Sequence, residues 1–188
     1  LRERLGEKSL QLDEAVGNLR IKVSGCFNSC GQHHLADLGF WGVSRKVGSY
    51  TVPHFQVVLG GNLRDNGSSF GLAIGAVPSK NIPRVTVRLV ETYARDREKG
   101  EGFAAFVARV GKAKIRALLE DLIQVPSRSD DPSYYSDWND PREYTIGDMG
   151  VGECAGEVVP FVQFGLAASE REAFEAQLCL ERGDARKA

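Results

Sequence analysis

The sequence predicts an α/β fold in which a mixed sheet of four to five strands is flanked by helices. Short segments in which apolar and polar residues alternate, such as 19–23, are typical of half-buried strands. Segments with apolar residues three and four positions apart, such as 83–99, are typical of amphipathic helices. A chain of 188 residues with 42% hydrophobic and 26% charged residues fits a soluble globular class and can bury one sizeable core.

The first part of the chain is expected to supply the strands. A moderate helix signal over residues 1–17 is interrupted at Gly6. The next expected elements are a strand over 19–23, a short helix that ends at Gly39, and strands at 40–43, 54–61 and 69–77. The strand at 54–61 is expected to end on a pair of glycines.

Three helices are expected to follow the strands. The first begins at Pro83, because proline is favoured at the first helical position, and extends to about Lys99. The second covers 103–110 and is stopped by Gly111, and the third covers 115–122.

The composition changes after residue 125. Residues 126–148 are rich in Ser, Asp, Pro and Tyr, which predicts a linker or an extended arm. Ser169 and Glu172 form a capping box that predicts a final helix. The expected organisation is therefore a first domain over 1–125, the arm over 126–148, and a short C-terminal appendage over 149–188. Both ends have helix-like patterns without a start or a stop signal, so we expect a part of a longer protein.

Charge and hydropathy exclude several classes of function. The net charge of −1 gives no basic surface of the kind that binds nucleic acid. No apolar run reaches the ~18 residues of a membrane span. Four cysteines in a chain of this length do not indicate a disulfide scaffold. We therefore expect a cytoplasmic protein, without membrane or nucleic-acid partners, whose clustered thiols are metal ligands or reactive groups.

The clustered thiols are Cys26 and Cys30, in the stretch "VSGCFNSCGQHHLADLGFWG". Taken alone, the pair is compatible with buried small side chains, or with a zinc site completed by His33 or His34. Its neighbours favour an anionic cluster, because Gly25, Ser29 and Gly31 leave room for backbone N–H groups to approach. A helix that begins just after Cys30 would add the positive end of its dipole.

This stretch resembles the siroheme and iron–sulfur domain of the assimilatory nitrite and sulfite reductases. In that family the second cysteine pair lies in a Gly-Cys-Pro-Asn-Ser/Gly-Cys-Gly motif. "FQVVLGGN" resembles the family's strand before a Leu-Gly-Gly turn, and "IPRVTVRLVETYARDREKGEGFAAFVARVG" resembles its closing stretch. The resemblance covers about residues 15–125 in order, which is far more specific than the cysteine pair alone.

The resemblance implies an oxidoreductase that reduces nitrite to ammonia or sulfite to sulfide with six electrons from ferredoxin or a flavoprotein. It implies that Cys26 and Cys30 are ligands of a 4Fe–4S cluster, and that Cys30 also bridges to the siroheme iron. Asn28 and Gly31 would lie near the cofactors, and Lys80 would pair with a siroheme carboxylate. It does not distinguish nitrite from sulfite.

The sequence departs from the family pattern at two points. Phe27 stands where the family has proline. The first cysteine pair is missing, and we expect it, with the substrate-binding residues, in an N-terminal remainder of the protein that packs on this part. The isolated chain is therefore expected to be inactive and apo. Two alternatives are a non-catalytic interaction module that has lost its cofactor, and a zinc-binding module.

The histidines have simpler interpretations. His33 and His34 lie beside the cysteines, but satisfied or solvent-facing side chains at the start of a helix explain them better than metal ligands do. His54 is expected to be structural. Cys154, between two glutamates, is expected to be a buried small residue.

Overall fold

The computed structural model describes residues 14–64 and 67–145, together with positions 169, 173, 176, 177 and 179. The chain divides into two compact units, residues 1–144 and residues 145–188. Most of the helix expected over 1–17, the capping residue Glu172 and Cys154 lie outside the described residues. Within the described ranges, no helix combines the length and the apolar character needed to cross a membrane.

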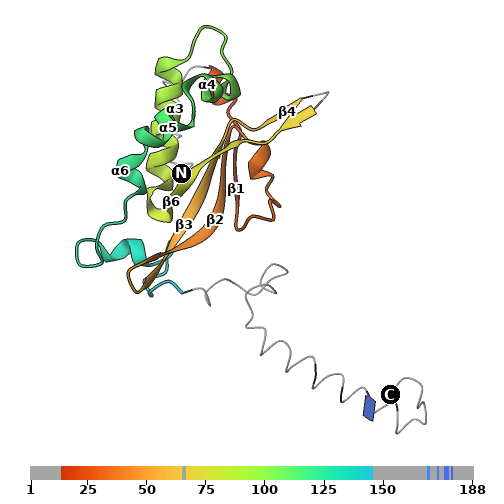
Figure 1. The fold of residues 1–188 in the computed structure, drawn as a ribbon, viewed down its shortest axis with the longest axis vertical. Helices are drawn as coiled ribbons and strands as arrows, with labels where there is room; N and C mark the ends of the chain where they lie inside the picture. Colours follow the sequence, from red (N-terminus) through yellow and green to blue (C-terminus); the bar gives the residue numbers. More distant parts are fainter. Residues whose placement is uncertain are drawn as a thin grey trace. The chain divides into compact units, whose positions relative to one another are not determined.

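A four-stranded mixed sheet forms the centre of the first unit (Figure 1). The spatial order is β1-β2-β3-β6, with bounds Ile21–Ser24, Leu38–Val47, Tyr50–Leu59 and Leu72–Pro78. β1 is parallel to β2, whereas β2 and β3, and β3 and β6, pair antiparallel. The α/β fold with a mixed sheet is therefore confirmed.

β2 and β3 are longer than predicted, because they form one continuous hairpin of ten residues on each side. The turn passes through Gly48, whose φ of 59° lies in the left-handed region. Pro53 lies inside β3, although a proline normally interrupts a strand. It is tolerated because β6 ends opposite His54, so Pro53 has no partner on that side of β3.

The strand predicted over 69–77 is split in the structure. Its first residue ends β5 (Gly67–Ser69), which pairs with β4 (Asn62–Arg64) in a separate two-stranded sheet. The remainder lies in β6, which begins at Leu72. The prediction was wrong here because the small hairpin has no alternating apolar face that would mark it in the sequence.

The helices cover one face of the sheet. They are α2 (Glu14–Gly17), α3 (Ile82–Asp96), α4 (Phe103–Val110), α5 (Lys112–Leu118) and α6 (Glu120–Ile123). α4 has both of its predicted bounds. The third predicted helix is divided into α5 and α6, because the backbone leaves helical geometry at Leu119 (φ −104°, ψ 3°).

The hydrophobic core lies between the sheet and these helices. Its sheet side is formed by alternate residues of the strands, including Leu38 and Phe40 of β2 and Val57 and Leu59 of β3. Its helix side includes Leu89 and Val90 of α3, Phe103, Phe106 and Val107 of α4, and Ile115 of α5. Alternation in the strands and spacings of three and four in the helices direct these side chains to one shared interior.

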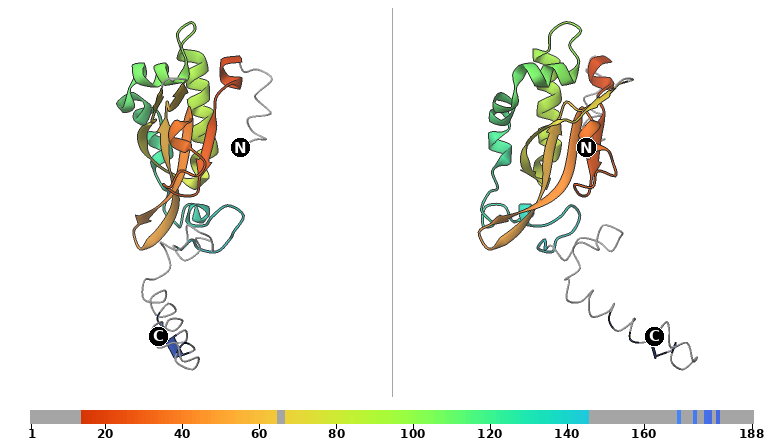
Figure 2. Two further views of the ribbon diagram at one scale, coloured as in Figure 1. Left: turned by 90° about the vertical axis from the view of Figure 1, so that its right-hand side faces the viewer. Right: turned by 45° about the vertical axis from the view of Figure 1, so that its right-hand side comes forward.

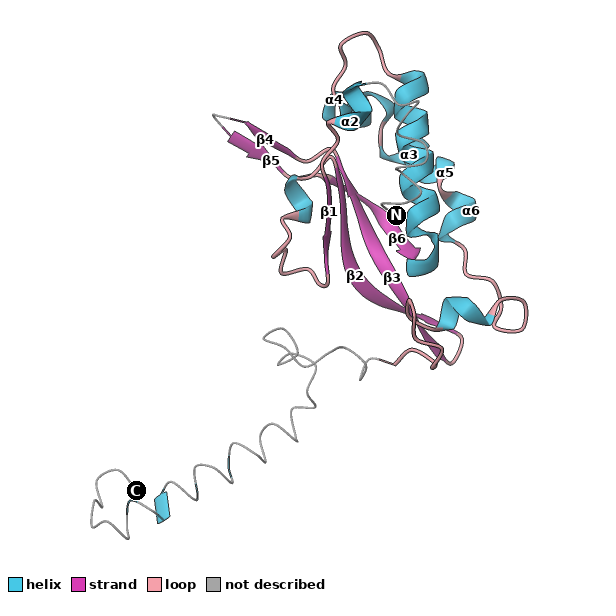
Figure 3. Ribbon diagram, turned by 180° about the vertical axis from the view of Figure 1, so that it is seen from behind, coloured by secondary structure: helices cyan, strands magenta, loops and turns pink. Residues whose placement is uncertain are grey.

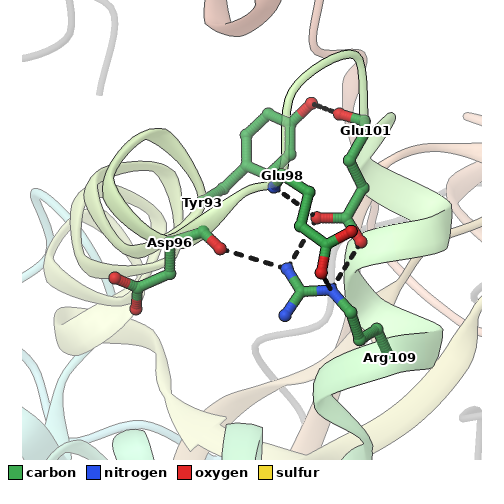
Figure 4. A network of polar contacts seen from close by, with 5 residues as sticks. All are labelled: Tyr93, Asp96, Glu98, Glu101 and Arg109. Carbon is green, nitrogen blue, oxygen red and sulfur yellow. Dashed lines mark hydrogen bonds and ion pairs between the residues drawn. The ribbon is translucent and has the colours of Figure 1, made fainter.

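A polar network holds the connection between α3 and α4 (Figure 4). Arg109 of α4 donates to both carboxylate oxygens of Glu101, at 2.7 and 2.6 Å, and to the carbonyl oxygen of Asp96 at 3.1 Å. The Tyr93 hydroxyl donates to the carbonyl oxygen of Glu101 at 2.7 Å. Glu101 and Arg109 belong to the stretch "REKGEGFAAFVARVG", so this part of the sequence has a structural role.

The start of the segment predicted as an arm packs against the first unit. Tyr135 in the 3-10 helix η3 (Pro132–Tyr135) is buried, and its ring meets that of Tyr50 in β3 edge to face. The Trp138 indole N–H donates to the carbonyl oxygen of Ser79 at 3.3 Å. Residues 132–138 therefore lie against the ends of β3 and β6.

Candidate functional site

The two cysteines lie on the crossover between β1 and β2. Because these neighbouring strands are parallel, the chain must return from the end of β1 to the start of β2, and residues 25–37 make this connection. Figures 2 and 3 show the connection on the side of the sheet away from α3–α6. Alternation along β2 agrees with this placement. Leu38 and Phe40 enter the core, whereas the residue after each of them, Gly39 and Trp41, faces the crossover.

The helix predicted within the crossover is much shorter than expected. Only His33–Leu35 forms a turn of 3-10 helix, η1, and Gly39 already belongs to β2. The prediction that a helix dipole supports the cysteines was therefore wrong, because one turn of this kind has no substantial macrodipole. Gly39 ends no helix but allows close approach: a Cβ at this position would lie 2.0 Å from the carbonyl oxygen of His33.

Glycines bring the crossover against the strands. A Cβ on Gly42 of β2 would lie 2.2 Å from the carbonyl oxygen of Gly25, and a Cβ on Gly31 would lie 2.6 Å from that of Val23. Both distances are shorter than any real contact, so each position needs glycine for the crossover to keep its course. This packing explains Gly31 structurally, and its predicted place beside a cofactor stays a prediction.

Two serines and two histidines form side-chain contacts across the crossover. The Ser24 hydroxyl oxygen accepts the Gly31 N–H at 3.2 Å and lies 2.9 Å from Nδ1 of His33. The Ser29 hydroxyl contacts Nδ1 of His34. Burial, and secondarily the charge of His34, lowers the pKa of His33, so its ring is neutral near pH 7. The prediction of satisfied histidines is confirmed for His33, which is buried and hydrogen-bonded.

The base of the crossover is fixed by an ion pair. Arg20 donates to Asp37 from its backbone N–H at 2.9 Å and from Nε at 3.0 Å, and its Nη2 donates to the carbonyl oxygen of Gly61 at 3.2 Å. Arg20 precedes β1 and Asp37 precedes β2, so the pair joins the two ends of the connection. The sequence analysis missed this pair and the serine–histidine contacts, because contacts across a loop produce no local pattern.

The segment from Gly25 to Gln32, hereafter the cysteine loop, presents both thiols. Cys26 is half-buried, Cys30 is exposed, and Asn28 between them is also exposed. The Phe27 side chain is 60% exposed and meets the ring of Trp41 edge to face at 6.3 Å. The loop therefore carries an exposed thiol, a half-buried thiol and an exposed aromatic ring within five residues.

Lys80 lies away from the cysteine loop. It follows β6, which forms the opposite edge of the sheet from β1. Its ammonium group donates to the carbonyl oxygen of Asp137 at 2.9 Å and lies 4.9 Å from the centre of the Trp138 ring. The structure does not bring Lys80 to the cysteine loop, and its pairing with a siroheme carboxylate stays a prediction.

His54 confirms its predicted structural role. It is buried in β3, and its Nδ1 lies 2.9 Å from the carbonyl oxygen of Val52.

Among the described residues, no three His, Cys, Asp or Glu side chains come together as a metal-binding group. A zinc site made of Cys26 and Cys30 with His33 or His34 therefore has no support in this geometry.

Comparison with known proteins shows that the cysteine loop lies within a region that matches a family model. The family model for the nitrite and sulphite reductase 4Fe-4S domain matches residues 18–126, from just before β1 to just after α6. The matched region contains the whole four-stranded sheet, the cysteine loop and the helices α3–α6.

Individual relatives agree with the family model. The chain is 34% identical over 118 residues to a protein of Mycobacterium tuberculosis named sulfite reductase (ferredoxin), covering 62% of this chain and 21% of that protein. It is 27% identical over 114 residues to the assimilatory ferredoxin-dependent nitrite reductase of Haloferax mediterranei, covering 61% of this chain and 20% of that protein. The chain spans about a fifth of the length of these relatives.

A solved structure shares the fold. The structure of the Mycobacterium tuberculosis NirA protein superposes with a TM-score of 0.52 at 34% identity, covering 62% of this chain and 21% of that one. The family model, the relatives and the solved structure thus agree on the same family. The chain belongs to the nitrite and sulphite reductase 4Fe-4S domain family.

Proposed function

We propose that this chain is part of a siroheme-dependent nitrite or sulfite reductase, in which Cys26 and Cys30 supply two of the four thiolates of a 4Fe–4S cluster. The observation that carries the proposal is the placement of both cysteines on one accessible loop inside the matched domain. The names of the relatives include both nitrite and sulfite reductases, so either anion is a candidate substrate.

The donor set fits half of such a cluster. Cysteine thiolates are the usual ligands of iron–sulfur clusters, and the loop presents two of them. Among the described residues, no three His, Cys, Asp or Glu side chains form a competing metal-binding group. When bound, the cluster and the siroheme carry the electrons for the six-electron reduction and hold the substrate. Cys30, the more exposed thiol, is the proposed bridge to the siroheme iron. The Asn28 amide is proposed to donate toward the cluster.

The rest of the assembly is proposed to come from outside this chain. The two other thiolates and the substrate-binding residues would belong to an N-terminal remainder of the same protein, which would cover the cysteine loop. On its own the chain would hold no cluster and catalyse nothing. The printed names of the relatives support ferredoxin as electron donor. A flavoprotein is the proposed alternative donor, and the proposed location is the cytoplasm.

The test uses the natural full-length protein, purified anaerobically, with three single substitutions. Cys26→Ser and Cys30→Ser are expected to reduce the iron content and the visible absorption of the cluster, and Cys30→Ser to abolish magnetic coupling between the two centres. Cys179→Ser is the matched control, because Cys179 lies in the second unit and outside the matched domain, and it should retain the wild-type iron content.

The same measurement separates the alternatives. Wild-type spectra in both loop variants would show that these cysteines are not ligands. A wild-type protein that contains zinc in place of iron would support the zinc module, and one that contains neither metal would support the interaction module.

A further inference from the structure

The contacts of His33 and His34 are arranged around the two cysteines. His33 reaches Ser24, two residues before Cys26, and His34 reaches Ser29, directly before Cys30. Each histidine thus contacts a serine beside one cysteine, although both histidines follow the loop in the chain. We refer to these two contacts, His33–Ser24 and His34–Ser29, as the histidine clamp.

Both histidines also contact residues outside the loop, His33 on β2 and His34 on the connection between β5 and β6. The His33 ring stacks on Trp41 of β2, with centroids 6.1 Å apart and an angle of 29° between the planes. The His34 ring meets Phe70 edge to face at 4.6 Å, and the His34 carbonyl oxygen accepts the Gly71 N–H at 2.8 Å. The clamp therefore links the loop to β2 through His33 and to the β5–β6 connection through His34.

Ser29 needs such support because of its backbone. Its φ of 61° lies in the left-handed region, which is unfavourable for residues other than glycine. A serine here is held in place through its side chain, by the contact with His34.

Ser24 supports the other end of the loop. Its hydroxyl oxygen accepts the Gly31 N–H, so the hydroxyl hydrogen is available for Nδ1 of a neutral His33 whose Nε2 carries the proton. The lowered pKa of His33 agrees with this neutral form. One buried hydroxyl thus links the end of β1, the residue after Cys30, and a ring fixed on β2.

We propose that His33 and His34 are positioning residues which hold the cysteine loop in the conformation that presents Cys26 and Cys30 to the cluster. The role of the loop as a cluster site rests on the proposed function, whereas the ordering of the loop by the clamp does not depend on iron. In this arrangement the Nδ1 atoms of His33 and His34 face the serines and form the clamp.

The experiment compares His34→Ala with the double variant His34→Ala/Ser29→Gly in the natural full-length protein. Hydrogen exchange of the loop amides is measured on the iron-free form, and cluster loss to a chelator is measured on the anaerobic form. His34→Ala is expected to accelerate both roughly tenfold, since the left-handed serine loses its support. The added Ser29→Gly should restore most of the protection, because glycine adopts this conformation without penalty.

A second pair of variants tests the His33–Ser24 contact of the clamp. His33→Ala should accelerate exchange of the Gly31 amide, whereas His33→Asn should preserve it, because the asparagine side chain places a polar acceptor near the position of Nδ1. His54→Gln is the matched control for loss of a buried histidine, since His54 contacts Val52 and not the loop. It should leave loop exchange at the wild-type rate even where global stability falls.

Failure of the clamp and failure of the proposed function give different results. Unchanged loop exchange in His34→Ala, or a double variant that exchanges as fast as His34→Ala, overturns the clamp. Wild-type protein without iron overturns the proposed function, and the exchange measurement on that same protein still decides the clamp.

Discussion

The two sides of the β1-β2-β3-β6 sheet are stabilised by different kinds of interaction. On the helix side, Phe40 is fully buried among other apolar side chains, and stability comes from burial and close packing. On the crossover side, Val23 and Phe27 are 50% and 60% exposed, and the loop is held by glycine contacts, two serine–histidine contacts and one ion pair. The difference teaches that the fold and the candidate function can be damaged separately.

The largest expected effect on stability lies on the helix side. Phe40→Ala should lower the free energy of unfolding by about 3–5 kcal/mol, because it removes a fully buried ring and leaves a cavity in the hydrophobic core. Urea unfolding of the chain, followed by far-ultraviolet circular dichroism, measures this loss. Phe27→Ala is the matched control, because this exposed ring should cost less than about 1 kcal/mol. Equal losses for the two phenylalanines would contradict the comparison.

Gly42→Ala should have an intermediate effect on stability and a large effect on the loop. The added Cβ collides with the carbonyl oxygen of Gly25, so the cysteine loop must shift, at a cost of about 1–3 kcal/mol. In the full-length protein this shift should prevent normal iron incorporation. Gly25→Ala makes a close control for the unfolding measurement, since a Cβ there meets no protein atom within 4 Å. If Gly42→Ala unfolded and bound iron like the wild type, the proposed course of the loop would be wrong.

The α3–α4 connection should contribute a pH-dependent part of the stability. The hydrogen bonds from Arg109 lower the pKa of Glu101 from 4.5 to about 2 in the folded protein. Between these values the unfolded chain binds more protons, so this contribution is complete above about pH 4.5 and is lost as the pH falls toward 2. Glu101→Gln should therefore reduce the acid sensitivity of the unfolding midpoint in this window. A variant with the same acid sensitivity as the wild type would show that the pair does not contribute.

Lys80→Met should have the smallest effect. It removes one exposed hydrogen bond to Asp137 and a cation–π contact with Trp138, which together should cost about 0.5–1 kcal/mol. Limited proteolysis of residues 126–145, compared with Lys112→Met on the helix side, measures the loosening of this segment. Siroheme content in the full-length protein tests the separate prediction that Lys80 pairs with a siroheme carboxylate. An unchanged content would remove Lys80 from the candidate site.

The helix side was largely predictable from the sequence, and the crossover only in part. The spacing of Phe103, Phe106 and Val107 before Gly111 gave both ends of α4, because periodicity reports burial directly. Gly39 was misread as the end of a helix, and the strand that contains Pro53 was predicted to begin only at residue 54. Both positions depend on what lies beside them in space, a close carbonyl group at Gly39 and an absent neighbouring strand at Pro53.

The site shows the same division. Cys26 and Cys30 were found from a motif, because the spacing of two ligands within one loop can be recognised in the sequence. The partners that order the loop, Ser24 with His33 and Ser29 with His34, were not assigned to each other, because hydrogen bonds across a loop leave no periodic signal. Nor did the sequence show that Lys80 lies at the other edge of the sheet, which follows from strand order.

The central claim is that the cysteine loop belongs to a siroheme and iron–sulfur reductase. Its most direct test is the visible absorption spectrum of the natural full-length protein, purified anaerobically, together with its iron content. The account predicts siroheme bands and roughly five irons per chain, four in the cluster and one in the siroheme. A colourless protein without iron would contradict it.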